Sequence, residues 1–299
     1  MQIGIVKEIW RYPVKSMGGE RITEATIGVD GIDGDRGYAT RDEGAGEIRG
    51  AKNIPALLSL QARYLAPPRG DSIPPVLITL PDGSTVRSDD PQVSAQLSAT
   101  VGRTVTLWPR QPAAALDHYR RGAPEGGDMM ADLRRIFGLD ADDPLPPVHE
   151  LPPELFQYVS PLGTYFDAFP LHLLSTATMA TLSTRHPAGR FDVRRFRPNL
   201  LMDLGAARGC PEEEWRDRVV RIGGVEVRVT MPAMRCVMTM TPQPDLPKDP
   251  LILRTIVKHN RSNGGVYATI STPGTVREGD PIALALLNGK KSTAISTER

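Results

Sequence analysis

The sequence predicts a mixed β and α protein: a closed or nearly closed β-barrel core with packed helices, plus a smaller α/β region at the N-terminal end. Three observations support this class. Most apolar residues lie in short alternating segments that Gly, Pro and Asp interrupt. Only three segments have the apolar spacing of a helix. The chain has 299 residues, enough for two ordinary domains or for one domain with a large insertion.

The N-terminal part is predicted to consist mainly of strands. The stretches "IGIVKEIWRYPVK" and "ERITEATIGVDGIDGDRGYAT" alternate apolar and polar residues between tight turns. Further strands are predicted in "LLSLQARYL", "PVLITLPDG", "STVRSD" and "TVTLWP". Residues 110–160 are rich in Pro, Gly and charge and are predicted to connect two halves. Within them, "DMMADLRRIFGL" is typical of a short helix, with Met129, Leu133, Ile136 and Phe137 on one face.

The second half is predicted to begin with a helix in "PLHLLSTATMATLSTRHP", with Leu173, Leu174 and Leu182 facing inward. Strands follow in "PNLLMDL", in the hairpin "RVVRIGGVEVRVTMPAMRCVM" and in "GVYATISTPGTVREGDPIALAL". A last helix is predicted in "PLILRTIVKHN", where Leu251, Ile252, Ile256 and Val257 have helical spacing. The tail "NGKKSTAISTER" is polar and is expected to fray.

The overall charge favours no nucleic acid or membrane partner. The chain has 36 basic and 35 acidic residues, a net charge of +1. No apolar run reaches the roughly 18 residues that cross a bilayer, and "MQIGIVKEIW" lacks the pattern of a secretory signal. Two cysteines without such a signal indicate free thiols in a reducing compartment. We therefore expect a cytoplasmic protein.

Several common sites are absent from the sequence. There is no Gly-x-Gly-x-x-Gly after a strand, no Walker lysine loop and no Gly-x-Ser-x-Gly elbow. The five histidines are scattered without paired spacing, so a histidine zinc or di-iron site has no support. These absences argue against dinucleotide, nucleotide and common hydrolase functions.

Two basic motifs in the first part could bind an anion. In "YPVKS", Lys15 and Ser16 follow a strand end and present a charge and a hydroxyl that suit a phosphate oxygen, although on this motif alone a solvated turn lysine is the favoured explanation of Lys15. In "GDRGYA", Arg36 stands among glycines as a possible anion clamp, or it pairs with Asp33. Nearby, "RGAKN" adds Lys52.

A third basic motif, "RFRPNL", lies in the second half. If this segment is a strand, Arg195 and Arg197 share one face and Phe196 packs on the other. Two guanidinium groups on one face either repel each other or share an anion. Asn199 places an amide close to the same position.

The stretch "MPAMRCVMTM" sets Cys236 among methionines and aliphatic residues. On these residues alone, Cys236 is either a small apolar filler or a thiolate that needs electropositive surroundings. Alternation along a strand places Arg235 on the opposite face, and the Pro-rich segment that follows puts Cys236 near a strand end. The other cysteine, Cys210, precedes three glutamates that are expected to raise its pKa.

In order along the chain, "YPVKS", "GDR", "FRPN", "RC", "DPLILRTI" and "PGTVREGDP" resemble the MOSC domain family. The resemblance is to its two-part members, such as the amidoxime-reducing component of mitochondria and its bacterial relatives. It implies a MOSC N-terminal region over residues 1–118, whose first strands, to about residue 36, can complete the core barrel. A MOSC domain over residues 119–290 and a frayed tail over residues 291–299 follow.

The resemblance also implies a cofactor and its site. Family members hold molybdenum through the dithiolene of a pterin, molybdopterin, with a cysteine thiolate as a further ligand, and Cys236 falls at that position. The positions of Lys15, Ser16, Arg36 and Arg197 match those that hold the pterin and its phosphate. Asn199, Arg235 and Tyr267 match positions along the pocket, and we include Lys52 among the predicted cofactor-binding residues. Ala168, Phe169 and Met234 depart from the hydroxyl residues of the mitochondrial relatives.

By resemblance, the expected activity is the reduction of N-hydroxylated small molecules by oxygen-atom transfer, with electrons from a separate flavin or iron-sulfur protein. Two alternatives stay open at this stage. Cys236 could carry a transferable sulfur in cofactor or natural-product assembly. The basic pocket could also bind an anionic ligand without catalysis.

Overall fold

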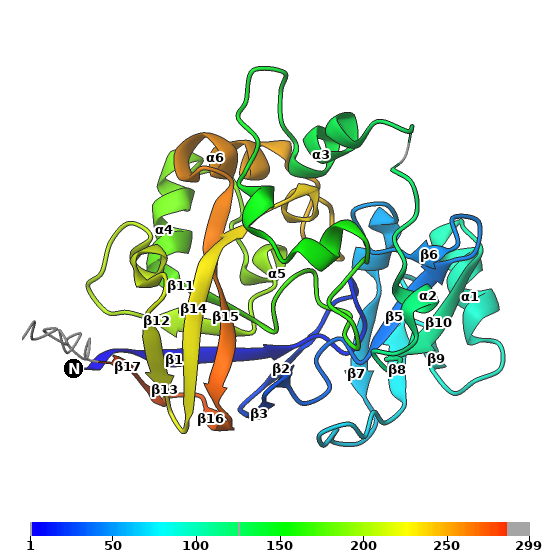
Figure 1. The fold of residues 1–299 in the computed structure, drawn as a ribbon, viewed down its shortest axis with the longest axis horizontal. Helices are drawn as coiled ribbons and strands as arrows, with labels where there is room; N and C mark the ends of the chain where they lie inside the picture. Colours follow the sequence, from blue (N-terminus) through cyan, green and yellow to red (C-terminus); the bar gives the residue numbers. More distant parts are fainter. Residues whose placement is uncertain (1, 125, 286–299) are drawn as a thin grey trace, which may run out of the picture.

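A closed β-barrel forms the centre of the computed structural model, which describes residues 2–124 and 126–285 (Figure 1). Strand β1 pairs with β17 on one side and with β12 on the other, and these two pairings close the wall. The predicted fold class is confirmed. Around the wall, the strands are β12 (Leu200–Asp203), β11 (Leu171–Ser175), β15 (Asn263–Thr272), β14 (Val225–Met234), β13 (Val219–Ile222), β17 (Pro281–Leu284) and β1 (Gln2–Arg11).

Alternating residues of these strands fill the barrel. Along β14, Val225, Val227 and Val229 are buried, while the residues between them are at least partly exposed. Each fully buried side chain of this size contributes about 1.5–3 kcal/mol to folding. The predicted Gly-Gly turn joins β13 to β14, and Gly223 has a φ of 54°, a conformation that favours glycine.

Three small sheets accompany the barrel among the described residues, and β2 (Glu20–Ile22) pairs antiparallel with the end of β1. Two of them form the region drawn in light blue and cyan, toward which β1 runs (Figure 1). The sheets are β10 (Val105–Pro109), β5 (Tyr38–Asp42) and β6 (Glu47–Ile48); β7 (Gln61–Tyr64), β8 (Val76–Thr79) and β9 (Thr85–Arg87); and β16 (Gly274–Arg277), β3 (Glu24–Gly28) and β4 (Gly31–Ile32). Helix α1 (Val93–Val101), which the sequence analysis did not anticipate, packs beside β10.

Two predicted helices are confirmed. Helix α3 (Met129–Phe137) begins at Asp128, whose carboxylate accepts the Met130 and Ala131 amides. Helix α6 (Pro250–Asn260) begins at Asp249 in the same way and has proline at its first position. In α6, Ile252 and Ile256 are buried as predicted, but Leu251 is 57% exposed and lies off the buried face.

The predicted helix over residues 170–187 is wrong in its first third. Leu173 and Leu174 belong to strand β11, and helix α4 (Thr176–Arg185) starts only after Ser175. The Ser175 hydroxyl accepts the Thr178 amide and caps the helix. A short run buried on all sides has no periodicity that separates a strand from a helix, which explains the error.

Short helices complete the described part of the chain. They are α2 (Leu116–Tyr119), α5 (Val193–Phe196), and the 3₁₀ helices η1 (Pro55–Ser59), η2 (Val148–Glu150), η3 (Pro153–Phe156), η4 (Pro211–Trp215) and η5 (Val237–Thr239). Within residues 2–124 and 126–285, no helix has the length and apolar character needed to cross a membrane. The predicted frayed tail, residues 291–299, lies outside the described residues.

Candidate functional site

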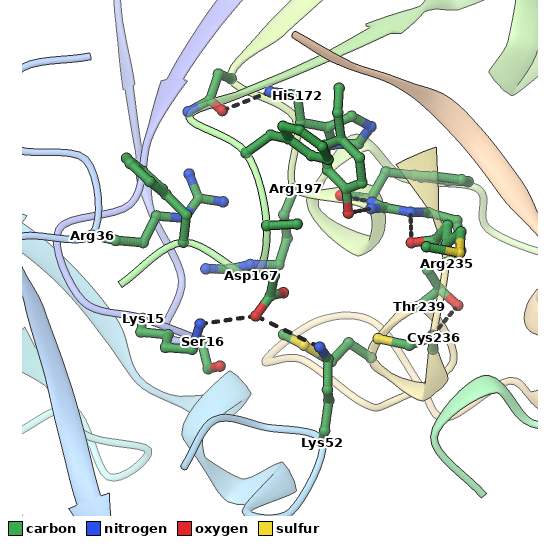
Figure 2. Close-up of a pocket in the computed structure, with 18 of the residues that line it drawn as sticks. Lys15, Ser16, Arg36, Lys52, Asp167, His172, Arg197, Arg235, Cys236 and Thr239 are labelled. Atoms are coloured by element: carbon green, nitrogen blue, oxygen red, sulfur yellow. Dashed lines mark hydrogen bonds and ion pairs between the residues drawn. The ribbon is translucent and has the colours of Figure 1, made fainter. Parts of the chain in front are cut away.

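A pocket lies where the loops after β1 and β4 meet the ends of β14 and α5 (Figure 2). Its empty volume is about 960 Å³, including the solvent at its mouth. It brings together residues from both halves of the chain, and all nine predicted site residues line it: Lys15, Ser16, Arg36, Lys52, Arg197, Asn199, Arg235, Cys236 and Tyr267. The roles predicted for these residues stay predictions.

Lys15 enters the pocket from the loop that follows β1. Its amide donates to the Tyr38 carbonyl at 2.8 Å, which fixes the loop against β5. Its ammonium donates to the Tyr165 carbonyl and to the Asp167 carboxylate, both at 2.8 Å. Burial lowers the pKa of Lys15, although Asp167 raises it. Lys15 is thus a buried cation held by two acceptors, not the solvated lysine of the alternative interpretation.

Ser16, next in the chain, has a positive φ of 69°. Its hydroxyl oxygen accepts the Ala51 amide at 2.9 Å and ties the first loop to the segment that carries Lys52. This conformation is uncommon for a residue with a side chain. The hydroxyl lines the pocket while it holds two loops together.

Arg36 pairs with Asp35, not with Asp33 as the sequence had left open. The Asp35 side chain is fully buried and also accepts the Tyr12 amide and the Asn199 side-chain amide, both at 2.8 Å. Asn199 in turn accepts the His172 amide through its side-chain oxygen at 3.1 Å. Asp35 therefore holds both the Arg36 guanidinium and the Asn199 side-chain amide in place.

Arg36 and Arg197 both lie over the ring of Tyr12, with guanidinium carbons 4.6 and 4.2 Å from its centroid. Both also have a positive φ, 50° for Arg36 and 57° for Arg197. Burial lowers the pKa of Arg197 to about 10, so this side chain is still a cation at neutral pH. Strained backbone of this kind concentrates at functional sites.

The predicted strand around Arg195 is wrong. Residues Val193–Phe196 form α5, and Arg197 is the left-handed residue that ends it. Arg195 and Arg197 therefore do not share a strand face. The Arg195 side chain is buried, and its hydrogen-bond acceptors among the described residues are the backbone carbonyls of Arg190, Thr239, Thr241 and Pro247. It supports the wall of the pocket instead of sharing an anion.

Arg235 follows the end of β14 and is held by three oxygens. It donates to the carbonyls of Met234 and Phe196 and, at 3.0 Å, to the Tyr267 hydroxyl. The Tyr267 ring lies 5.3 Å from that of Phe169. Arg235 thereby fixes Tyr267 and the end of α5, immediately before Arg197.

His172 lies under this part of the pocket and was missed by the sequence analysis. Its Nε2 donates to the Gly264 carbonyl at 2.9 Å, and its ring lies 5.7 Å from that of Tyr267. Burial and the charge of Arg235 hold the pKa of His172 well below its usual value. The imidazole is therefore neutral at physiological pH.

Cys236 stands two residues after β14, near the strand end that the sequence predicted, and directly precedes η5. The residue is half-buried and its thiol is free. Its carbonyl accepts the Thr239 amide and hydroxyl, at 3.0 and 2.9 Å. Cys236 and Lys52 point toward one another (Figure 2). Burial acts to lower the pKa of Lys52, but the Asp167 carboxylate, with a smaller effect from Cys236, raises it overall. This thiol thus has the electropositive neighbour that its own segment lacked.

Asp167 is a second residue that the sequence analysis missed. Its carboxylate lies 2.8 Å from the Lys15 ammonium and 3.6 Å from that of Lys52. Burial acts to raise its pKa, but Lys15 and Lys52 outweigh this and hold the pKa well below its usual value. An acidic residue directly before Ala168 and Phe169 was the available signal.

The pocket therefore combines six basic side chains, one thiol and the single carboxylate of Asp167 among its described lining residues. This excess of positive charge suits a phosphate-bearing ligand. Within the described part of the chain, no three His, Cys, Asp or Glu side chains gather to hold a metal ion. A metal at Cys236 would need further ligands from a non-protein group.

The sequence and this geometry define a two-part MOSC protein. The model of the MOSC domain matches residues 162–283, and that of the MOSC N-terminal beta barrel domain matches residues 3–113. The chain belongs to the MOSC family.

Its relatives include mitochondrial amidoxime-reducing component 1 of Homo sapiens, which is 27% identical over 321 residues, covering 95% of this chain and 83% of the relative. The protein of the same name from Xenopus laevis is 26% identical over 309 residues, covering 94% and 82%. Among solved structures, the YUAD protein from Bacillus subtilis matches with a TM-score of 0.41 and 12% identity over 93% of each chain.

Proposed function

We propose that this protein is a molybdenum-pterin oxidoreductase that reduces N-hydroxylated small molecules. The observation that carries the proposal is the position of the Cys236 thiol beside Lys52, in a pocket that also holds Lys15, Arg36, Arg197 and Arg235. The names of the relatives at 26–27% identity support an amidoxime or similar substrate. In the overall reaction, the N–O bond breaks, two electrons and two protons are consumed, and an amine-type product and water leave.

The residues present fit the implied cofactor. Cys236 offers a soft thiolate ligand, and the cations suit a phosphate tail. When bound, the molybdenum-pterin group would supply the two-electron oxygen-atom transfer. Lys15, Arg36 and Arg197 would hold the phosphate and pterin, while Arg235 would keep Tyr267 against the pocket wall. Ala168, Phe169 and Met234 give this chain an apolar surface in place of hydroxyl donors.

The electrons would come from a separate flavin or iron-sulfur protein, because the sequence carries no recognised motif for such a cofactor. We also propose a reducing, cytoplasmic location, which the two free thiols of Cys210 and Cys236 support.

Metal analysis of protein from a host that makes molybdopterin tests the proposal. We expect close to one molybdenum per chain, and reduction of an amidoxime by a chemically reduced viologen. Cys236→Ala should abolish the reduction, whereas Cys210→Ala, a control at the other thiol, should leave it unchanged. Substoichiometric molybdenum that Cys236→Ala does not alter would refute the proposal. A labile sulfur on Cys236 without pterin would instead support a sulfur carrier.

A further inference from the structure

A second pocket opens beside the cationic one, on the side of α3. Its empty volume is about 1070 Å³, including the solvent at its mouth. The two pockets share four lining residues: Lys52, Phe137, Leu151 and Asp167. They are therefore adjoining chambers separated by these shared side chains.

The wall of this second pocket is mainly apolar. The apolar side chains come from α3, η2, η3 and the segments between them: Met129, Leu133, Ile136, Phe137, Val148, Leu151, Leu155 and Phe156. Several of these pack on the cluster of Phe137, Met231 and Met234, against which Cys236 also packs. An apolar surface thus continues from Cys236 to α3.

Two large apolar side chains of the pocket stay exposed to water. Phe156 is 57% exposed and Met129 is 47% exposed. Single exposed apolar residues are common, but two that line the same concave pocket indicate a surface that a ligand covers.

The charged side chains of this pocket all have partners within the described residues. Glu47 accepts from Arg49 and from the Gly122 amide. Arg121 donates to the carbonyls of Leu155 and Tyr158. Asp132 pairs with Arg135, and Asp167 pairs with Lys15 and Lys52. Because these charges are already compensated, the pocket favours a neutral ligand group over an ion.

We propose that the α3-side pocket binds the apolar body of the substrate, a neutral alkyl or aryl group, while the N-hydroxylated head reaches the chamber of Cys236. The identity of the head group rests on the proposed function. The apolar character of the substrate body is inferred from the lining of the second pocket alone. The enzyme would then select amphipathic substrates and discriminate against small polar ones with the same head group.

The test uses the holoenzyme and a series of n-alkylhydroxylamines from methyl to octyl. Calorimetric titration without reductant gives the dissociation constants, and turnover with a reduced viologen gives kcat/KM. We expect affinity to rise about fourfold per methylene, until the chain fills the pocket. Equal affinities for the methyl and octyl compounds would overturn the inference.

Matched variants locate the effect. Met129→Asp and Phe156→Asp place a charge in the second pocket and should reduce the gain to less than about twofold per methylene. Met130→Asp is the control, because Met130 is 49% exposed on the same helix but does not line the pocket. This variant should keep the full increase in affinity per methylene. An equal loss in all three variants would contradict the assignment.

The same measurements test the apolar subsite and the redox function separately. A binding gradient that Phe156→Asp removes, in a protein that reduces none of the compounds, would support the apolar subsite and refute the redox function. Reduction with the same kcat/KM at every chain length would refute the subsite and leave the redox function standing.

Discussion

Asn199 donates its side-chain amide to the buried carboxylate of Asp35 at 2.8 Å. This contact joins the loop after β4 to the residue before β12, so it links the N-terminal loops of the pocket to the barrel wall. Since Asp35 also pairs with Arg36, the position of a pocket cation depends on an interaction between distant segments.

Replacing Asp35 with alanine should destabilise the protein. The Tyr12 amide, the Asn199 amide and the Arg36 guanidinium would lose their common acceptor. Leaving such buried donors unpaired costs about 3 kcal/mol or more. Urea unfolding measures the loss, and Asp33→Ala in the same turn is the control, expected to cost less than about 1 kcal/mol. Equal unfolding midpoints for the two variants would contradict this role of Asp35.

Asp167→Asn should strengthen anion binding in the pocket. The substitution removes the carboxylate beside Lys15 and Lys52, so inorganic pyrophosphate should bind about three- to tenfold tighter, with a steeper salt dependence. Calorimetry on protein from a host without molybdopterin tests this, with Asp132→Asn as control.

The pH dependence of this gain follows from the Asp167 pKa. Because this pKa is lowered, the carboxylate is charged at every pH above about 4, its unfolded value. With sulfate as the anion, whose own charge does not change between these pH values as that of pyrophosphate does, the gain should therefore be the same at pH 6 and pH 7. A gain that appears only at the higher pH would show that Asp167 is protonated at pH 6.

Cys210 should react slowly with alkylating agents. Burial, together with the charge of Glu213, raises its pKa to about 11. At pH 8, its thiolate fraction is then about a hundredfold below that of an ordinary cysteine. Iodoacetamide labelling followed by peptide mass spectrometry should show this difference in the folded protein, and the rate should rise with pH toward 11. Labelling of Cys210 at the rate of a free cysteine would refute the expectation.

Arg195 and Arg194, neighbours on α5, should differ sharply in their effect on stability. Arg195→Met leaves buried carbonyls without their donor, at a cost of about 3 kcal/mol or more. Arg194→Met removes partly exposed pairs with Asp192 and Asp245, at a cost below about 1 kcal/mol. Urea unfolding of both variants makes the comparison. Similar losses would mean that Arg195 is not the supporting residue that its contacts indicate.

The sequence was most informative where local chemistry decides the structure. The Asp128 and Asp249 caps and the Gly-Gly turn at Gly223 are each encoded within a few residues, and the corresponding helices and hairpin form as predicted. Leu173 and Leu174 were misplaced because a fully buried strand and a helix produce the same apolar run. Tertiary packing resolves that ambiguity.

The pocket was predictable only in part. Lys15, Arg36 and Cys236 were found through motifs, but Asp167 is brought to Lys15 across 152 positions of the chain. Arg197 departs from strand alternation because it ends a one-turn helix with a positive φ, which no propensity for arginine predicts. Contacts between residues that are distant in the sequence leave no local trace in it. The same holds for backbone that packing keeps in a strained conformation.

Strand β1 pairs with β17, the last strand described, and this pairing has a consequence for synthesis. Strand β1 leaves the ribosome before the other described strands, and its neighbour β17 emerges only when nearly all of the described chain has been synthesised. Such long-range pairing is intrinsically slow, because the ends of a long chain must first meet. The barrel therefore closes only once β17 has been synthesised, and a ligand that needs both walls of the pocket can bind only after that point.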